Sequence, residues 1–521
     1  MMVTSMASTT YPADVVSEQF PVIRTEIIRA PSKTLDWLHR ALLVGVVVLA
    51  PVMLYVCFGA SVSDLAADHQ LAPTFGLVHG YRLYYPADHG PVLSTIYGPV
   101  TALVYLPATL ASTPASAMFL AALITMVLFY GGSWFALRHA ASTTRMVWWQ
   151  MLAITIAVTW AIPPLQRAAT LIHADAPALA FAGIAAAFAM RSKWRFSRWE
   201  NEFVAGAFSV ASVLAKQNMV PLVAGLVIWV FLRSRWKGLG VFGGASFLCS
   251  LAMLALIEVR LGGIKAFLFN CYYLPRHQPY EMVLLFPAWS QLVIASFALL
   301  AIPSFLLLRD WLQSEKKLRD FLLERKTPLF VLCGVLLVPT SVMGRLKYGA
   351  TESALCPTLF FFALLLLAEL LNPPSTDEQG SKSTSGFALV PVLLFCLIAG
   401  LPAPYLARRT RPNNPSQQVF AYCQSNPGTV YFPQFPLAQL MGEERLYHFS
   451  WGLNDRRAAG VAVTDAHFAA NLPEASVMAI LPWVPEWDNE VAKHHAEGVA
   501  LPGASQLTGF EFFAMGHRQP R

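Results

Sequence analysis

The sequence SDLAADHQLAPTFGLVHGYRLYYPADHGPVLSTIYGPVTALVYLP, residues 63–107, is a polar loop held between apolar segments. A loop that only joins two helices needs a few small polar residues. This one carries carboxylates, imidazoles and aromatic rings directly after the first membrane-length apolar run. We therefore expect a functional surface at the edge of a membrane. Its ionisable groups include Asp64, Asp68, His69, His79, Arg82, Asp88 and His89.

The composition of the whole chain is that of a polytopic membrane protein. Hydrophobic residues make up 56% of the 521 and charged residues 13%, about half the charged fraction of an average soluble domain. Mean hydropathy is +0.50. The net charge of +7 sits mainly in short loops, which is typical of topology signals and does not indicate a nucleic-acid partner. The seven cysteines form no CxxC pair, so neither a disulfide framework nor a zinc site is predicted.

Apolar runs of spanning or near-spanning length recur along the chain. The run at 203–232 is too long for one upright helix, and Lys216-Gln217-Asn218 near its middle predict two short helices or one broken helix. We expect 11 to 13 membrane segments in an α-helical bundle, beginning with a retained signal anchor. The runs are 38–60, 97–113, 116–137, 146–163, 171–190, 203–232, 239–258, 286–308, 329–343, 354–371 and 386–403.

Positively charged loops predict which side of the membrane each connection faces. Basic clusters at 191–198, 233–237 and 309–326 are assigned to the cytoplasm, together with the N-terminal tail, 1–37. The connections that then face outward are 61–96, 261–285, 344–353 and everything after 403.

Two basic clusters conflict with this topology. Arg138 and Arg145 also favour the cytoplasm, which requires an odd number of crossings between 97 and 137, where two apolar runs are found. One of these two runs is therefore a candidate for a re-entrant or interfacial segment. The cluster Arg408-Arg409-Arg411 follows the last run on the outer side, so either that helix is inverted or these arginines meet lipid phosphates.

The tail from 404 to 521 has a globular composition. Turn signals occur at Asn413-Asn414-Pro415 and at Asn426-Pro427-Gly428. Short apolar runs at 430–435, 477–481 and 510–515 are typical of strands. We predict a small soluble α/β domain on the outer side, following a transmembrane catalytic domain at 38–403.

Asp64 and Asp68 are the candidate catalytic carboxylates. Their spacing of four places both on one face of a helix. A carboxylate at a membrane edge can act as general base on a hydroxyl or amine, and it can also hold a divalent cation such as Mg²⁺ or Mn²⁺. A helix cap or a solvated loop position is the plainer interpretation. The neighbouring imidazole of His69 and the aromatic content of the loop favour a site.

Two further groups of ionisable residues interrupt apolar sequence. His173 and Asp175 begin a run, where Asp175 could cap a helix or belong to a site. Lys216 and Gln217 lie inside another run, and a lysine in lipid normally faces a partner or a cavity, or extends to the interface. We expect these residues to contact the phosphate or sugar of a substrate.

Basic residues also occur in loops assigned to the outer side, against the usual charge bias. Arg276 and His277 follow two tyrosines, and Arg345 and Lys347 lie in the sequence GRLKYG. Guanidinium and ammonium groups bind phosphate, so these residues are candidate phosphate ligands. Tyr97 fits either an interfacial aromatic belt or a surface on which a sugar ring stacks.

The order of these segments resembles the GT-C superfamily of integral membrane glycosyltransferases. The resemblance rests on "HGYRLYYP…YGP…LVYLPA" after an acidic outer loop, then "HADAPAL", "AKQNMVPL" and "GRLKYG", and covers residues 38–370. Protein O-mannosyltransferases and bacterial aminoarabinose transferases belong to this superfamily. The order of the motifs and the side of the membrane on which they lie support the resemblance more than any single motif does.

The resemblance implies a polyprenyl-phosphate sugar donor and catalysis at the outer face of a bilayer. By position Asp68 matches the catalytic acid of the first outer loop, with Asp64 as the alternate. Arg276, Arg345 and Lys347 match the donor-phosphate contacts. The adjacent acidic pair frequent in the family is absent here, which leaves the choice of base and the metal requirement open.

The sequence thus predicts a membrane glycosyltransferase that moves a sugar from a polyprenyl-phosphate donor to an unspecified acceptor. A bacterial inner membrane with the active site facing outward is the expected location. A transporter or flippase for a lipid-linked or polar solute is the alternative, although no internal repeat typical of transporters is found.

Overall fold

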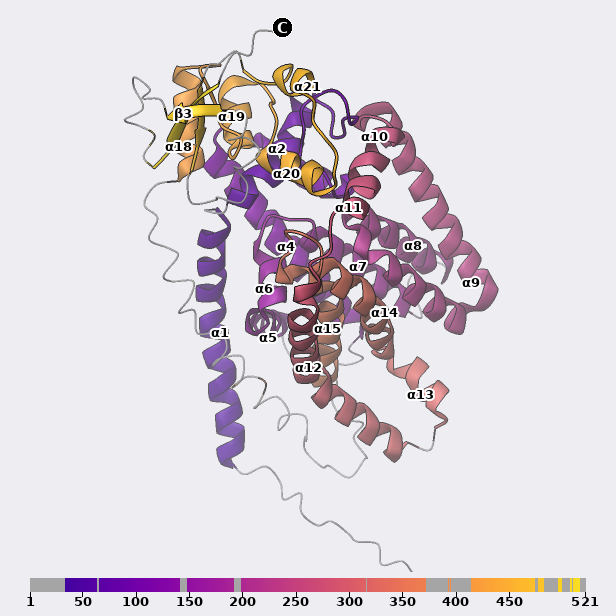
Figure 1. The fold of residues 1–521 in the computed structure, drawn as a ribbon. Helices are drawn as coiled ribbons and strands as arrows, with labels where there is room; N and C mark the ends of the chain where they lie inside the picture. Colours follow the sequence, from indigo (N-terminus) through magenta and orange to yellow (C-terminus); the bar gives the residue numbers. More distant parts are fainter. Residues whose placement is uncertain are drawn as a thin grey trace, which may run out of the picture.

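The computed structural model describes residues 33–62, 65–140, 148–191, 198–314, 316–371, 414–473, 477–481, 495–498, 507 and 509–515, and positions 392 and 394. Figure 1 shows a bundle of long helices with a smaller part, built from the C-terminal residues, resting on one end. The predicted boundaries at 37/38 and 403/404 remain predictions.

The described helices between residues 33 and 191 range from 5 to 30 residues in length. Their bounds are α1 (Lys33–Val62), α2 (Leu65–Val78), α3 (Pro99–Val104), η1 (Leu106–Leu110), α4 (Pro114–Ala140), α5 (Trp148–Ala161), α6 (Pro163–Thr170) and α7 (Asp175–Met190).

The second half of the bundle contains the longest helix. Its elements are α8 (Arg198–Ala215), η2 (Gln217–Met219), α9 (Val220–Leu256), η3 (Ile257–Leu261), α10 (Ile264–Leu268), η4 (Phe269–Tyr273), α11 (Leu274–His277), η5 (Met282–Leu284), α12 (Leu285–Gln313), α13 (Leu318–Arg325), α14 (Pro328–Arg345), η6 (Glu352–Leu355) and α15 (Cys356–Leu371).

Five described helical segments are long and apolar enough to cross a membrane, and α5 with α6, bent by 116°, makes a sixth if taken as one broken span. Shorter apolar helices lie at Arg40–Val52 and Asp175–Met190. The number of candidate spans among the described residues is thus below the 11 to 13 segments expected from the sequence. The five segments are Pro114–Ala140, Gln217–Leu261, Met282–Gln313, Pro328–Arg345 and Glu352–Leu371.

The run predicted at 97–113 does not form a membrane helix. It forms the six-residue α3, which begins at Pro99, and the short 3₁₀ helix η1, where Pro107 lacks the amide N–H that would continue α3. Only α4 then connects this region to Arg138. The single crossing removes the conflict that Arg138 posed for the predicted topology.

The predicted break at Lys216 is present. Helix α8 ends at Ala215, and Lys216 is extended, with φ −145° and ψ 118°. Helix α9 then runs on past the predicted basic loop but is kinked at Arg235, where φ is 57°. The long apolar run is thus divided at Lys216, and the kink at Arg235 falls within the predicted basic loop.

Three predicted outer loops meet at one end of the bundle, which we call the loop end. The amide of Tyr84 donates to the carbonyl of Leu261, and the amide of Glu281 donates to the carbonyl of Leu346. At the opposite end Arg233 donates to the carbonyl of Ala189 at 2.9 Å. This grouping matches the one predicted from charge.

The C-terminal residues form the predicted small α/β unit. Its mixed sheet has the order β1-β2-β4-β3, with β1 parallel to β2 and the other pairs antiparallel. Three of the strands coincide with the predicted apolar runs. The elements are α18 (Pro415–Ser425), β1 (Val430–Tyr431), α19 (Pro436–Glu443), α20 (Ser450–Ala458), α21 (Asp465–Ala469), β2 (Val477–Ile480), β3 (His495–Gly498) and β4 (Glu511–Met515).

This unit docks on the first loop through buried polar contacts. Arg456 is 2% exposed and donates to the carbonyl of Ala87 at 2.6 Å. The amide of Val92 donates to Nδ1 of His448 at 2.9 Å. Burial lowers the pKa of His448 to about 3, so this imidazole is neutral and its Nδ1 can accept.

Candidate functional site

A buried ion pair lies where α8 breaks. The Nζ of Lys216 donates to Oδ1 of Asp175 at 2.5 Å, and Nδ1 of His173 lies 2.7 Å from Oδ2 of the same carboxylate. Asp175 is 1% exposed and Lys216 7%. An extended residue at 216 lets the lysine leave the helix and reach α7. The structure thus brings three of the predicted site residues together.

Tyr97 and Gln217 belong to the same cluster. The ring of Tyr97 meets that of His173 edge-on, with centroids 4.8 Å apart, and lies 5.6 Å from the Nζ of Lys216. The side-chain amide of Gln217 donates to the carbonyl of Ile96 at 2.9 Å. The first loop is therefore tied to the helix break at Ile96 and at Tyr97.

Several polar atoms beside the break are buried without a partner in the described structure. They are Oε1 of Gln217, Oδ1 of Asn218 and Nε of Arg345. Helix α14 packs against η2, and a Cβ added at Gly344 would lie 4.0 Å from Nδ2 of Asn218. Unpartnered polar groups of this kind are normally completed by water or a ligand.

Arg345 and Lys347 lie at the end of α14 and are partly buried. Arg345 donates to the carbonyl of Ala350 at 2.8 Å, and Lys347 donates to the carbonyl of Gln278 at 3.1 Å. The Nζ of Lys347 also lies 3.8 Å from the centre of the Tyr280 ring. Among the described residues neither cation has a carboxylate partner, so both remain electrically uncompensated.

Arg276 and His277 do not join the buried cluster. Both are exposed on the short helix α11. Nη1 of Arg276 lies 3.2 Å from the hydroxyl of Tyr272, and His277 stacks on Tyr273 with ring centroids 4.0 Å apart. Their predicted contact with a donor phosphate remains a prediction.

An apolar groove runs between α3, α8 and α9. Its volume is about 350 Å³, and its lining includes Leu214, two residues before Lys216. Gly98 brings α3 against α8 so closely that a Cβ at 98 would lie 1.9 Å from the carbonyl oxygen of Leu214. The full lining is Val100, Ala207, Val210, Ala211, Leu214, Cys249, Ala252, Met253 and Leu256.

Asp68 is placed under the C-terminal unit instead of at an opening. Its side chain is 0% exposed, and its Oδ1 accepts from the amide of Leu437 in the first turn of α19 at 2.6 Å. Phe435 at the N-cap of α19 offers no side-chain acceptor, so Asp68 caps this helix from a distant part of the chain. Burial raises the pKa of Asp68 to about 7, against opposing hydrogen bonds from Leu437, Ser416 and Ala438.

His69 is likewise part of this junction. It is 1% exposed and stacks on Trp451 with ring centroids 4.5 Å apart. Burial lowers its pKa to about 3, so the ring is neutral. The predicted substrate contact of His69 would require α19 and α20 to move away.

Only the Asp68 half of the candidate cation site at Asp64 and Asp68 lies within the described residues. A divalent cation needs several oxygen ligands, whereas the groups that point at this carboxylate include the backbone N–H of Leu437. Asp64 lies outside the described residues. Among the residues that the structure does describe, no group of three or more His, Cys, Asp or Glu is arranged to hold a metal. The metal requirement, which the sequence leaves open, can be tested by activity assays with and without EDTA.

Asp455 in α20 was missed by the sequence analysis. It reaches the loop end, where its Oδ1 accepts from Gln278 at 2.8 Å and its Oδ2 from Ser94 at 3.3 Å. Burial raises its pKa to about 7. Its local sequence, SWGLNDRR, contains no motif that separates it from other acids of a soluble domain.

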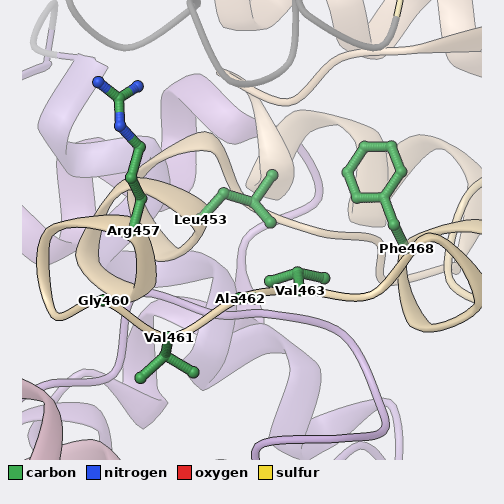
Figure 2. A pocket seen from close by; sticks show the side chains of 7 residues that line it. All are labelled: Leu453, Arg457, Gly460, Val461, Ala462, Val463 and Phe468. Carbon is green, nitrogen blue, oxygen red and sulfur yellow. The ribbon is translucent and has the colours of Figure 1, made fainter.

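A cavity of about 320 Å³ lies on the other side of α20. Figure 2 shows its lining, with Arg457 pointing away from Val461. Leu453 and Arg457 are four residues apart and share one helix face, whereas Asp455 lies midway between them in sequence and faces the opposite way. This cavity is therefore separate from the loop-end cluster.

Comparison with known proteins identifies the fold. The structure of ArnT from Cupriavidus metallidurans bound to undecaprenyl phosphate matches with a TM-score of 0.52, covering 92% of this chain and 99% of that chain at 12% identity. The chain has a GT-C fold. This confirms the predicted class, a helical membrane protein with a small C-terminal α/β unit.

A second GT-C structure extends over a similar share of the chain. It is the archaeal oligosaccharyltransferase AglB from Archaeoglobus fulgidus in complex with an inhibitory peptide and a dolichol-phosphate, with a TM-score of 0.42, 12% identity and coverage of 94% of this chain and 75% of that chain. No family model and no curated protein sequence matches this chain.

Proposed function

We propose that this protein is a membrane glycosyltransferase that moves one sugar from a polyprenyl-phosphate donor to an acceptor at the extracytoplasmic face. The observation that carries the proposal is the pair of uncompensated cations, Arg345 and Lys347, beside a break lined by unpartnered polar atoms. A phosphate supplies the negative charge and the acceptor oxygens that this arrangement lacks. The GT-C fold supports the same class of reaction.

The apolar groove supports a lipid-linked donor. Its lining is almost entirely aliphatic and ends two residues from Lys216, so a polyprenyl tail in the groove would place its phosphate near the break. Burying each CH₂ of such a tail contributes about 0.8 kcal/mol. The donor would then be held by its tail and its phosphate without leaving the bilayer.

Each residue of the cluster has a role in this proposal. Arg345 and Lys347 bind the donor phosphate and stabilise the charge that grows on it as the sugar leaves. Lys216 is already paired with Asp175, so it orients the site more than it neutralises phosphate. Tyr97 and His173 lie beside this pair, where a sugar ring would stack.

The role of Asp68 in proton transfer is a separate proposal, since it rests on position in the first loop alone. Its complete burial under α19 requires the C-terminal unit to open before a substrate could reach it. If Asp68 is the base, Asp68→Asn abolishes transfer. If it serves as a helix cap, Asp68→Asn retains activity, because the amide oxygen still accepts from Leu437.

The experiment that tests the function is transfer by purified protein with a panel of polyprenyl-phosphate sugars. We expect one donor to be consumed by the wild type, with strong loss in Arg345→Ala and little loss in the exposed control Arg260→Ala. If none of the donors is turned over, and a solute or lipid instead moves across the vesicle membrane, this proposal is overturned and the protein is a transporter.

The sidedness can be tested with a pair of exposed positions. Arg276 lies at the loop end and Lys237 near the kink of α9 at the opposite end. A membrane-impermeant thiol reagent added to intact bacterial cells expressing the chain should label Arg276→Cys but not Lys237→Cys above the parent background. The reverse pattern would place the site on the cytoplasmic side.

A further inference from the structure

The C-terminal unit brings one carboxylate into the loop end. Helix α20 approaches the first loop so closely that a Cβ at Gly452 would lie 2.6 Å from the carbonyl oxygen of Leu93. Glycine at this position permits the contact. Asp455 follows on the same side of the helix, which places its carboxylate between the first loop and residues 274–280.

Asp455 is linked to the proposed phosphate site through a single residue. The side chain of Gln278 donates to Oδ1 of Asp455, and the backbone carbonyl of the same glutamine accepts from Nζ of Lys347. Gln278 is 5% exposed, so both contacts are held in place by packing. A sugar held by its phosphate on Lys347 would therefore lie within reach of this carboxylate.

Three aspartates at the loop end differ in their availability. Asp68 is 0% exposed and caps α19, and Asp175 is 1% exposed and paired with Lys216. Asp455 is partly exposed, and within the described structure its hydrogen-bond partners are the neutral side chains of Ser94 and Gln278. It is the one of these three that can reach a substrate with its charge unpaired.

We propose that Asp455 is the catalytic base that accepts the proton of the incoming acceptor, an inference that rests on the glycosyltransferase function proposed above. The acceptor oxygen or nitrogen forms a bond to the anomeric carbon of the sugar. The bond from that carbon to the phosphate oxygen breaks, and its electron pair stays on the polyprenyl phosphate. The acceptor proton passes to Asp455.

The surroundings of Asp455 suit this role. The pKa raised by burial to about 7 places the carboxylate near neutral pH, where a general base works best. Among the described residues of the first loop, Tyr97 interacts electrostatically with Asp455, and Lys347 lies beyond Gln278. Arg456 on the same helix is turned toward the carbonyls of Pro86 and Ala87.

The test compares Asp455→Asn with the wild type in the full chain, using a donor that the wild type consumes. General-base catalysis is typically worth 10²- to 10⁴-fold, so we expect kcat to fall by about that factor while KM for the donor stays within about twofold. The acid limb of the pH–rate profile near pH 7 should disappear. The exposed carboxylate of the same unit, Asp465→Asn, serves as the matched control.

A second pair keeps the test decisive if Asp455→Asn fails to fold. Asp455→Glu and Asp455→Gln have the same shape and disturb docking alike, but only the glutamate can accept a proton. Equal activity in this pair, or an unchanged acid limb in Asp455→Asn, overturns the proposal. A wild type that consumes no donor would instead refute the glycosyltransferase function, so the two failures are distinguishable.

Discussion

Asp68 and Asp175 are both buried aspartates at the loop end, but their partners differ in kind. Asp68 accepts from a backbone amide of α19, whereas Asp175 meets the side chains of Lys216 and His173. A carboxylate that caps a helix fixes how two parts of the chain dock. A carboxylate paired with a lysine holds a charge in apolar surroundings. The identity of the partner therefore indicates the role better than burial does.

Lys216→Ala should have the largest effect of the changes that probe this comparison. It leaves Asp175 buried without its cation, and breaking a buried pair costs about 3–5 kcal/mol. Thermal unfolding in detergent should show a strong loss of stability. The double variant Lys216→Met with Asp175→Leu should recover much of it. If the single variant is as stable as the wild type, the pair does not hold the break together.

Arg345→Ala and Lys347→Ala should weaken donor binding without comparable loss of stability. Hydrogen bonds to a charged group contribute about 1.5–3 kcal/mol, so each change should cost roughly 10- to 100-fold in affinity for undecaprenyl phosphate. The exposed Arg260→Ala, measured beside them, should bind within about threefold of the wild type. Equal losses in all three would indicate a diffuse charge effect instead of a site.

Asp68→Ala should destabilise the docking of α19 by about 0.5–2 kcal/mol, the usual cost of losing a helix cap. Asp68→Asn keeps an acceptor for Leu437 and should be nearly neutral. Limited proteolysis of the C-terminal unit measures the difference. Equal protection in both variants would show that the cap contributes nothing to docking.

The pH dependence of the same junction gives a finer test. The pKa of Asp68 is raised from 3.8 to about 7 in the folded state, so between these values the folded chain holds a proton that the unfolded chain has lost. Stability contributed by this group is therefore present below about pH 4 and falls as the pH rises toward 7. Asp68→Asn should flatten that slope. An unchanged slope would mean that other groups set it.

The sequence predicted the bundle, the break at Lys216 and the grouping of the loops, because apolar runs and basic clusters are local signals. It overestimated the run at 97–113, because hydropathy does not register that a helix starts at Pro99 and is interrupted by Pro107. Tyr97, His173 and Lys216 were each predicted as site residues, but not as one cluster. Their contact depends on helix packing, which the residue pattern does not encode.

Asp68 and Asp455 show the limit of reading single positions. Asp68 gains its partner from a helix 369 residues later in the chain, so no local pattern could place it under α19. Asp455 lies in a soluble unit whose sequence carries no recognisable motif. Its relation to the site exists only because Gly452 lets α20 approach Leu93.

The cap that Asp68 provides has a consequence for how the protein is made. Ribosomes add about 5–20 residues per second, so roughly 20–70 s separate the synthesis of Asp68 from that of Leu437. During that interval the carboxylate and His69 have no α19 or α20 to cover them. The bundle thus keeps this surface uncovered until the C-terminal unit has been synthesised. A chain that terminates early exposes the same surface, which quality-control proteases can recognise.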